Sequence, residues 1–214
     1  MLYTITKFFL RMAFHIHYNL RYEGRKAVPK GEAFVVVSNH RTNVDPPLIA
    51  AGCRGRHTFM AKEELFRKKI FAWFIRMLGA FPVSSGKGDM AVIDTSVENL
   101  NSGKNLIIFP EGTRSKDGKI GRGHTGAALI AARSGKRLLP VGIIFDEKLK
   151  FRTKLTIKFG EPIDPKDYVD SQEEPNPRQL VKLKNKYMEE IKKLVEGEPE
   201  NNAPAQEETP DEPA

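Results

Sequence analysis

The sequence predicts an α/β fold, a single domain with a mostly parallel β-sheet flanked by helices and preceded by an N-terminal amphipathic interfacial helix. Short apolar runs alternate with segments of helical periodicity, and strands separated by helices of this length favour a parallel sheet. The middle runs are apolar almost throughout, as in strands covered on both faces. A chain of 214 residues is long enough for one well-buried domain of this kind.

The first segment, residues 1–22, is expected to form a helix that lies in the membrane interface. Polar and basic side chains recur at three- and four-residue steps and so form one stripe of a helix: Thr4, Lys7, Arg11, His15 and Asn19. Lys7 and Arg11 interrupt the apolar run, whereas a transmembrane helix needs about 20 mostly apolar residues. A broad apolar face with a basic stripe is typical of an interfacial helix. The alternative is a helix that packs on its own domain.

The strands and helices of the main domain are expected between residues 23 and 196. Strands are predicted at 34–38, 57–61, 80–83, 105–109, 138–145 and 154–159. Helices are predicted at 46–52, 63–78, 88–101, 124–134 and 177–195. Residues 197–214 are rich in proline and glutamate and lack apolar periodicity, which predicts a disordered acidic tail.

The charge of the chain is unevenly distributed. The net charge is +8, but the last 18 residues carry six acidic side chains and no lysine or arginine. Without them, 35 basic side chains face 21 acidic ones, a net charge of +14. Such a body favours an anionic partner, either nucleic acid, a membrane surface or a phosphate-bearing substrate. The charges are scattered and no nucleic-acid-binding motif is present, so no nucleic-acid partner is expected.

No metal site is expected. Cys53 is the single cysteine, which excludes a disulfide framework and a cysteine-based metal site. It follows the apolar run LIAAG and is expected to be a small buried core residue. His15 and His17 lack acidic or cysteine partners nearby, so they are not expected to bind metal either.

The stretch SNHRTNVDPP, residues 38–47, follows the predicted strand FVVVS. His40 lies just past the carboxyl end of that strand, where open parallel sheets place their ligand sites. Asp45 followed by Pro46 indicates a helix start, with the aspartate as N-cap and the proline at the first helical position. Taken alone, the stretch is explained most simply by a capped helix and a loop histidine.

The stretch FPEGTRS, residues 109–115, also follows a predicted strand and precedes a helix. Two such loops at one sheet edge can face each other. Arg114 could bind a phosphate, and Gly112 lets backbone N–H groups approach a ligand closely. The simplest alternative is a type I turn starting at Pro110 with a surface arginine.

These residues resemble a known family. NHRTNVD contains the NH-x4-D motif of the glycerophospholipid acyltransferases, and FPEGTRS matches their third motif throughout. The segments KEEL (62–65), GAFPV (79–83) and LLPVGI (138–143) resemble further blocks of the family. The similarity runs in order from about residue 20 to 160 and is greatest to the bacterial 1-acyl-glycerol-3-phosphate (lysophosphatidate) acyltransferases.

The resemblance implies an O-acyltransferase in phospholipid biosynthesis. His40 would act as general base on an acceptor hydroxyl, and Asp45 would fix its tautomer and stabilise the imidazolium. The hydroxyl would attack the thioester of acyl-CoA or an acyl-carrier protein, with no further cofactor and no covalent acyl-enzyme. Backbone N–H groups near Gly112 are expected to hold the oxyanion.

The acceptor's phosphate would be bound by Arg114, with Lys62 as a second cation. Glu111 is expected to orient Arg114 or to contact the glycerol hydroxyl region. The remaining residues that the resemblance assigns to the acceptor pocket are Arg41, Asn43 and Thr113. The expected location is the cytoplasmic face of the cell membrane, as a peripheral enzyme that contacts membrane lipids.

One position departs from the family. Its second motif usually ends in an arginine, G-x-F-x-x-x-R, whereas the stretch GAFPVSSGKGD has Ser85 there. Lys87 lies two residues on, but a flexible point charge does not reproduce a guanidinium fork. The acceptor could therefore be glycerol-3-phosphate or a lysolipid with another headgroup.

Two other classes of function stay open from the sequence. A basic, non-enzymatic binder of nucleic acid or lipid is one, and an inactive relative that serves as a lipid-binding module is the other. GRGHTG, residues 121–126, fits the dinucleotide pattern G-x-G-x-x-G, but polar, turn-forming residues precede it in place of the strand that the pattern requires. Nucleotide binding is therefore not expected.

Overall fold

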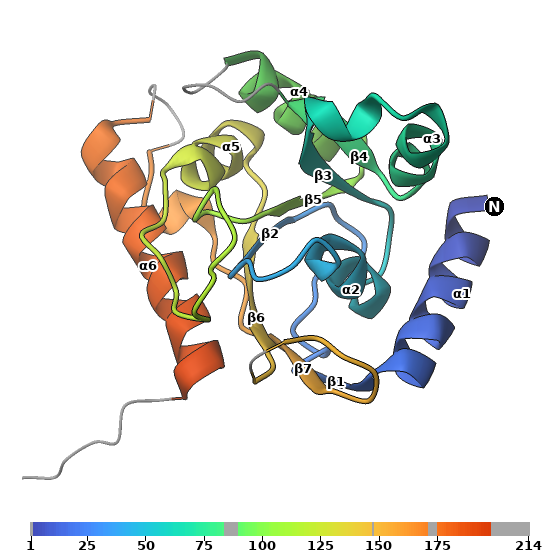
Figure 1. Cartoon of the computed structure of the whole chain (residues 1–214). Coiled ribbons are helices and arrows are strands. Elements are labelled where there is room, and N and C mark those ends of the chain that lie inside the picture. The colour runs from blue at the N-terminus through green and yellow to red at the C-terminus, as the bar shows by residue number, and fades with distance from the viewer. Residues whose placement is uncertain (1, 84–89, 147, 171–174, 198–214) are drawn as a thin grey trace, which may run out of the picture.

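The fold of the chain is seen in a computed structural model that describes residues 2–83, 90–146, 148–170 and 175–197. Within this part of the chain, one seven-stranded sheet has the order β1-β7-β6-β2-β5-β3-β4 (Figure 1). Its strands are β1 (Asn19–Glu23), β2 (Val35–Ser38), β3 (His57–Lys62), β4 (Ala80–Val83), β5 (Asn105–Ile108), β6 (Leu138–Ile144) and β7 (Lys154–Phe159).

The sheet is mostly parallel, as predicted. Strands β2 to β6 run in one direction, and β7 pairs antiparallel with β6. At the edge, β1 pairs parallel with β7. All six predicted strands are present, with ends that differ from the prediction by at most one residue. The carboxyl ends of β2, β3 and β5 therefore lie at one edge of the sheet.

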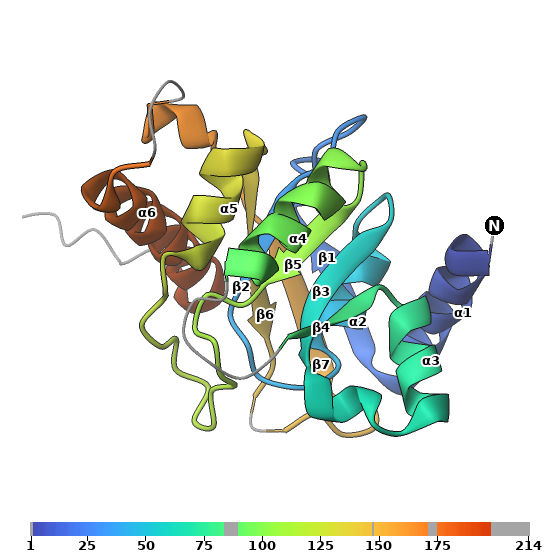
Figure 2. The same ribbon diagram turned by 90° about the horizontal axis from the view of Figure 1, so that it is seen from above.

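Helices cover both faces of the sheet (Figure 2). One face carries α1 (Leu2–His17), α2 (Asp45–Gly52) and α3 (Lys69–Met77), and the other carries α4 (Met90–Asn101), α5 (Gly126–Ser134) and α6 (Pro177–Glu196). Short 3-10 turns are η1 (Glu63–Phe66) and η2 (Pro165–Asp167). The helix predicted over 63–78 is thus two elements, because Lys68 between them has an extended backbone.

The central strand β2 is buried on both faces. Val36 packs in the core under α1 to α3, while Val35 and Val37 pack in the core under α4 to α6. All three valines have no exposed surface, and each such burial stabilises the fold by ~1.5–3 kcal/mol. The strand is therefore a rigid mount for the loop that begins at Asn39.

The prediction of one helix over residues 1–22 is wrong at its end. The helix stops at His17, and Asn19–Glu23 form β1. Leu20 is buried in the core, and the Tyr22 ring stacks on Phe159 of β7 with centroids 6.3 Å apart. Pairing with a strand far along the chain overrides the local helical pattern, which is why periodicity alone missed this strand.

Helix α1 packs on its own domain along one side. Phe14 and Tyr18 are part of the core, and Lys7 Nζ donates to the carbonyl oxygens of Cys53 at 2.5 Å and Gly55 at 3.2 Å. Part of the predicted basic stripe thus faces the body. The opposite side is exposed and apolar, formed by Ile5, Phe8, Phe9, Met12 and Ile16. In the described residues, no helix is long and apolar enough to cross a membrane.

Cys53 is buried at the end of α2, as predicted. Burial raises the pKa of its thiol to about 12. The predicted acidic tail from residue 198 onward lies outside the described residues, and the division of the chain at residues 23 and 197 stays a prediction.

Candidate active site

The two motif loops meet because their strands are neighbours. β2 and β5 are paired in parallel, with Val37 opposite Ile108, so the loops that follow start at the same level of the sheet. The long segment between β5 and α5 projects from this carboxyl edge, beside the β2–α2 loop (Figure 2). The predicted meeting of these two loops is confirmed by the contacts between them.

His40 and Asp45 form a hydrogen-bonded pair in the β2–α2 loop. The Nδ1 atom of His40 lies 2.8 Å from Oδ2 of Asp45, whose side chain is fully buried. A carboxylate oxygen only accepts, so Nδ1 carries the proton and Nε2 keeps its lone pair. The His40 side chain is 19% exposed, and among the described residues Nε2 has no partner. This is the arrangement that a general base requires.

Asp45 does not cap helix α2, contrary to the prediction. The N-cap is Val44, without a side-chain hydrogen bond. The Asp45 carboxylate turns back into the preceding loop, where it accepts from the backbone N–H groups of Arg41 and Thr42, each at 2.7 Å, and from the Thr42 hydroxyl at 2.5 Å. These donors, together with His40, hold the carboxylate in one orientation toward the imidazole.

The FPEGTRS loop fixes His40 from the other side. The His40 backbone N–H donates to Glu111 Oε1 at 3.0 Å, and its carbonyl oxygen accepts from the Ser115 N–H at 2.8 Å. The imidazole stacks on the Phe109 ring, with centroids 3.9 Å apart and planes at 16°. Both the backbone and the ring of the histidine are thus held by the FPEGTRS loop.

The expectation that Glu111 orients Arg114 is wrong. Glu111 is buried, and its second carboxylate oxygen accepts from the Gly121 N–H at 2.8 Å. One carboxylate therefore ties the His40 loop to the segment that leads into α5. Arg114 instead donates through Nη1 to Asn43 Oδ1 at 3.0 Å. Arg114 and Asn43, both predicted acceptor-binding residues, thus lie together, and Asn43 belongs to the loop that carries His40 and Asp45.

Arg41 points to the end of β6. Its guanidinium donates to the carbonyl oxygens of Phe145 and Asp146, and lies 3.7 Å over the Phe145 ring centroid. The side chain is thus held in the wall of the site, which agrees with a role in its shape.

The backbone N–H of Gly112 is engaged in a turn. It donates to the Phe109 carbonyl oxygen at 3.0 Å, which closes a turn over Phe109–Gly112 with Pro110 at its second position. Gly112 has φ +69°, a conformation that favours glycine. This hydrogen bond occupies the Gly112 amide itself, and an oxyanion site formed by other backbone N–H groups near Gly112 stays a prediction.

The remaining predicted residues lie at the same edge or outside the described residues. Thr113 is exposed and borders a shallow polar hollow, together with Glu111, Ser115, Asp117, Lys119, Ile120, Gly121 and Arg122. Lys62 is exposed as the last residue of β3. Ser85 and Lys87 fall in 84–89, outside the described residues.

Asn39 is a positioning residue that the sequence reading did not assign. Its side-chain amide donates to the Ile143 carbonyl oxygen at 2.9 Å, and its oxygen accepts from the Ile143 N–H at 2.8 Å. These bonds extend the contact between β2 and β6 by one residue beyond Ser38. They thereby fix the position of the backbone that leads into His40. Its place in the NH-x4-D motif was the only sequence signal for this role.

Neither a metal site nor a dinucleotide fingerprint is formed by the described residues. No group of three or more His, Cys, Asp or Glu side chains there could hold a metal ion. The GRGHTG segment does not follow a strand directly, because β5 ends at Ile108 and the Gly121 N–H binds Glu111.

Comparison with known proteins agrees with this site. The family model described as Acyltransferase matches residues 19–144, which is more than half of the chain and includes both motif loops. The chain belongs to the acyltransferase family. The match ends at residue 144, so it contains the His40–Asp45 pair, the FPEGTRS loop and the Ile143 that anchors Asn39.

Curated and solved members of the family are similar to this chain. It is 36% identical over 158 residues to a 1-acyl-sn-glycerol-3-phosphate acyltransferase of Streptococcus pneumoniae, covering 71% of this chain and 58% of the relative. A Bacillus subtilis protein of the same name is 27% identical, and the alignment covers 86% of this chain and 92% of the relative. The crystal structure of the 1-acyl-sn-glycerophosphate (LPA) acyltransferase PlsC from Thermotoga maritima matches with a TM-score of 0.70 and 31% identity, over 91% of this chain and 78% of that one. The chain thus spans less than two thirds of the Streptococcus relative's length.

Proposed function

We propose that the chain transfers a fatty acyl group to the sn-2 hydroxyl of 1-acyl-glycerol-3-phosphate, forming phosphatidate. The observation that carries the proposal is the His40–Asp45 pair, whose Nε2 atom is free within the described residues and whose backbone is held by the FPEGTRS loop. The names of the Streptococcus and Bacillus relatives support this acceptor. The donor would be acyl-CoA or an acyl-carrier protein.

The base chemistry needs only groups that the chain supplies. His40 Nε2 removes the proton of the acceptor hydroxyl as the oxygen attacks the thioester carbonyl carbon. The tetrahedral intermediate collapses with loss of the C–S bond, and the imidazolium returns its proton to the leaving thiolate. Asp45 stabilises the imidazolium between these steps, because its buried carboxylate lies 2.8 Å from Nδ1.

The acceptor's phosphate would bind near Arg114. Asn43 accepts from one nitrogen of this exposed guanidinium, which leaves other N–H donors for an anion. Lys62, at the carboxyl end of the neighbouring strand β3, would supply a second cation for the phosphate. The arrangement would place a phosphate beside the base, with the glycerol hydroxyl between them.

The substrate also bears on location. A lysophospholipid is held in a membrane, and the exposed apolar side of α1 would bring the chain to that surface. We propose that the protein is a peripheral enzyme at the membrane, on its cytoplasmic face.

An acceptor panel tests the proposal. Purified protein is incubated with a labelled acyl donor and with 1-acyl-glycerol-3-phosphate, glycerol-3-phosphate or lysolipids with other headgroups, and the products are separated. Labelled phosphatidate is expected as the main product. Turnover of another acceptor without phosphatidate would show that the chemistry is right and the acceptor wrong, and no turnover on any acceptor would overturn the proposal.

A further inference from the structure

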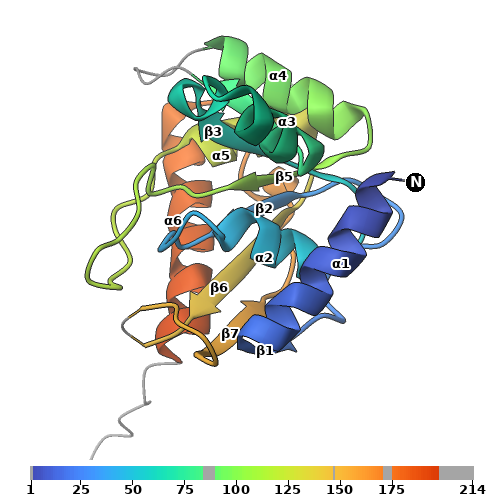
Figure 3. The ribbon, with the colours of Figure 1, turned by 45° about the vertical axis from the view of Figure 1, so that its right-hand side comes forward.

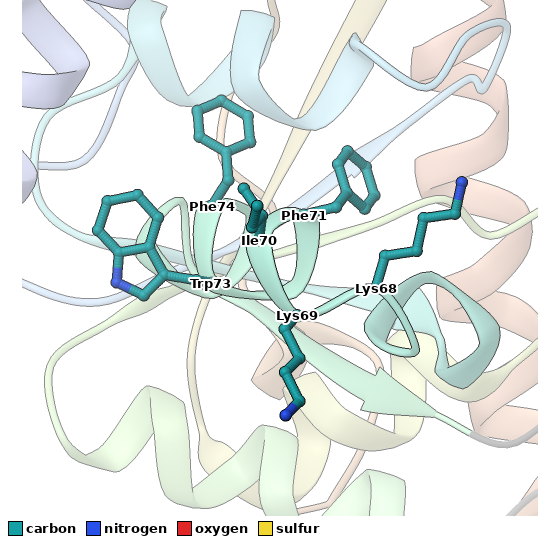
Figure 4. Close-up of a pocket in the computed structure, with 6 residues that line it drawn as sticks. All are labelled: Lys68, Lys69, Ile70, Phe71, Trp73 and Phe74. Carbon is teal, nitrogen blue, oxygen red and sulfur yellow. The ribbon is translucent and has the colours of Figure 1, made fainter.

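Helix α3 presents large apolar side chains to solvent. Ile70 is 86% exposed and Trp73 63%, and Phe71 and Phe74 are also exposed. These four side chains, here called the α3 surface, line a hollow of about 770 Å³ and project outward from the helix in different directions (Figure 4). Only Ala72 and Ile75 of the helix are buried. Soluble proteins rarely expose a contiguous cluster of this kind without a partner.

The α3 surface lies on the same side of the molecule as α1. The two helices are neighbours in each view, and the Thr6 hydroxyl lies 3.8 Å from Met77 Sδ (Figure 3). Helix α1 also exposes apolar side chains, among them Phe8 at 65% and Ile16 at 63%. Two helices distant in sequence thus expose apolar groups on one side of the fold.

The charge of both helices is positive. Neither α1 nor α3 contains an aspartate or glutamate, while α3 has Lys69 and Arg76 and is preceded directly by Lys68. The carboxylates nearest to α3 in the sequence are those of Glu63 and Glu64, which lie before the helix in η1. Basic groups around exposed aromatic and aliphatic side chains complement an anionic lipid surface.

We infer that the α3 surface is a second membrane-binding site, which inserts into the headgroup region of an anionic bilayer together with α1. Trp73 suits this place, because its ring is apolar and its N–H needs a polar partner, as at membrane interfaces. Two separate contacts define a plane, whereas a single helix leaves the body free to rotate about its axis. The lipid surface is the occupant that matches both the apolar groups and the exclusively basic charge of the two helices.

The second membrane contact also has a consequence for catalysis, and this consequence rests on the proposed function. Lys62 ends β3 at the catalytic edge, and η1 leads from it directly into Lys68 and α3. A membrane that holds α3 therefore lies next to the edge that carries His40. The lysolipid acceptor would then reach the base without leaving the interface.

Trp73 is the only tryptophan of the chain, so its fluorescence reports on this site alone. Full-length protein is mixed with phosphatidylglycerol vesicles or with phosphatidylcholine vesicles, with and without brominated acyl chains. A blue shift and quenching by brominated lipid are expected with phosphatidylglycerol, and a weaker response with phosphatidylcholine. Protein that floats with the vesicles while Trp73 emission stays unchanged would overturn the inference and leave binding through α1 intact.

A matched pair of variants measures the contribution to binding. Ile70→Gln with Trp73→Gln removes apolar groups from α3, and Met90→Gln with Val181→Gln removes exposed apolar groups from α4 and α6, on the other face of the sheet. The α3 variant is expected to lower the vesicle partition coefficient about tenfold, and the control variant to leave it unchanged. Equal partitioning of the two would contradict the inference.

The main rival occupant is a second copy of the chain. It predicts a concentration-dependent blue shift of Trp73 without vesicles and a doubled mass in sedimentation, and this result would overturn the inference. Because fluorescence and flotation need no turnover, they also separate this site from the proposed function. An enzyme that fails the acceptor panel can still insert Trp73, and an active enzyme can fail to insert it.

Discussion

A single carboxylate, that of Glu111, holds both loops of the candidate site. One oxygen accepts from the His40 N–H and the other from the Gly121 N–H. In Glu111→Gln, the amide nitrogen would face one of these donors, so one hydrogen bond becomes a repulsion. Because His40 is displaced but still present, kcat should fall about 10- to 100-fold with little change in KM for either substrate.

Steady-state kinetics of Glu111→Gln check this prediction, with exposed Glu161→Gln as the matched control. A large rise in KM for the acceptor at constant kcat would instead indicate that Glu111 contacts substrate, as the sequence reading expected.

Ser85 carries a second prediction at the residue scale. It occupies the position where the resembled family usually has an arginine for the acceptor phosphate. Ser85→Arg should therefore lower KM for 1-acyl-glycerol-3-phosphate, since a guanidinium forms charge-assisted hydrogen bonds to phosphate. Ser84→Arg is the control one residue away. An unchanged KM in Ser85→Arg would mean that Arg114 and Lys62 already supply the phosphate contacts.

The sequence predicted that His40 and Asp45 form a pair, but not the hydrogen bonds that hold the pair in place. Their spacing alone does not single them out; His40 and Asp45 stand out because FPEGTRS follows a second strand and both stretches resemble motifs of one family. Asn39 and Glu111 act through backbone amides of Ile143, His40 and Gly121. Such partners leave no residue pattern, so only the folded geometry reveals them.

At the scale of elements, His57 links α1 to the sheet. Its Nδ1 atom lies 3.4 Å from the Tyr3 hydroxyl, and its Nε2 atom lies 3.2 Å from the Asn105 side-chain nitrogen. Burial, together with the charge of Lys7, lowers the pKa of His57 to about 3. An imidazole whose folded pKa is below its unfolded value of about 6.5 stabilises the protein above that value and loses this contribution as pH falls.

The free energy of unfolding should therefore drop between pH 7 and pH 5, by up to ~1.4 kcal/mol per pH unit below about 6.5. Urea titrations monitored by circular dichroism measure it. Exposed His15→Gln should keep this dependence, and His57→Gln should weaken it. A urea midpoint that does not change from pH 7 to pH 5 would show that His57 binds its proton equally well in the folded and the unfolded protein.

The boundaries of strands and helices were predictable where the pattern of apolar residues marks them. The strands β2, β5 and β6 follow from their apolar runs, since burial on both faces leaves a plain signal. β7 follows from the alternation of buried and more exposed residues. β1 was missed because its partner β7 is remote, and the break at Lys68 was missed because no glycine or proline marks it. Both depend on tertiary contacts that a local pattern does not contain.

At the scale of the whole molecule, the sheet fixes the positions of the residues that form the site. β2 lies between β5 and β6 with both faces covered, so the residues after these strands are held at fixed positions. Helices α1 and α3 lie together on one side and expose apolar and basic groups. The fold class, and thus the shared edge of the two motif loops, was predictable from the alternation of strands and helices. The joint surface of α1 and α3 was not, because it is assembled from distant segments.

The central claim is that His40 is the base of an acyl transfer to lysophosphatidate. The most direct test is the initial rate of phosphatidate formation by His40→Ala, with exposed His15→Ala as the matched control and equal urea midpoints as the check on folding. The rate should fall by about 10²–10⁴-fold in His40→Ala and stay at the wild-type level in His15→Ala. A folded His40→Ala variant that forms phosphatidate at the wild-type rate would contradict the account.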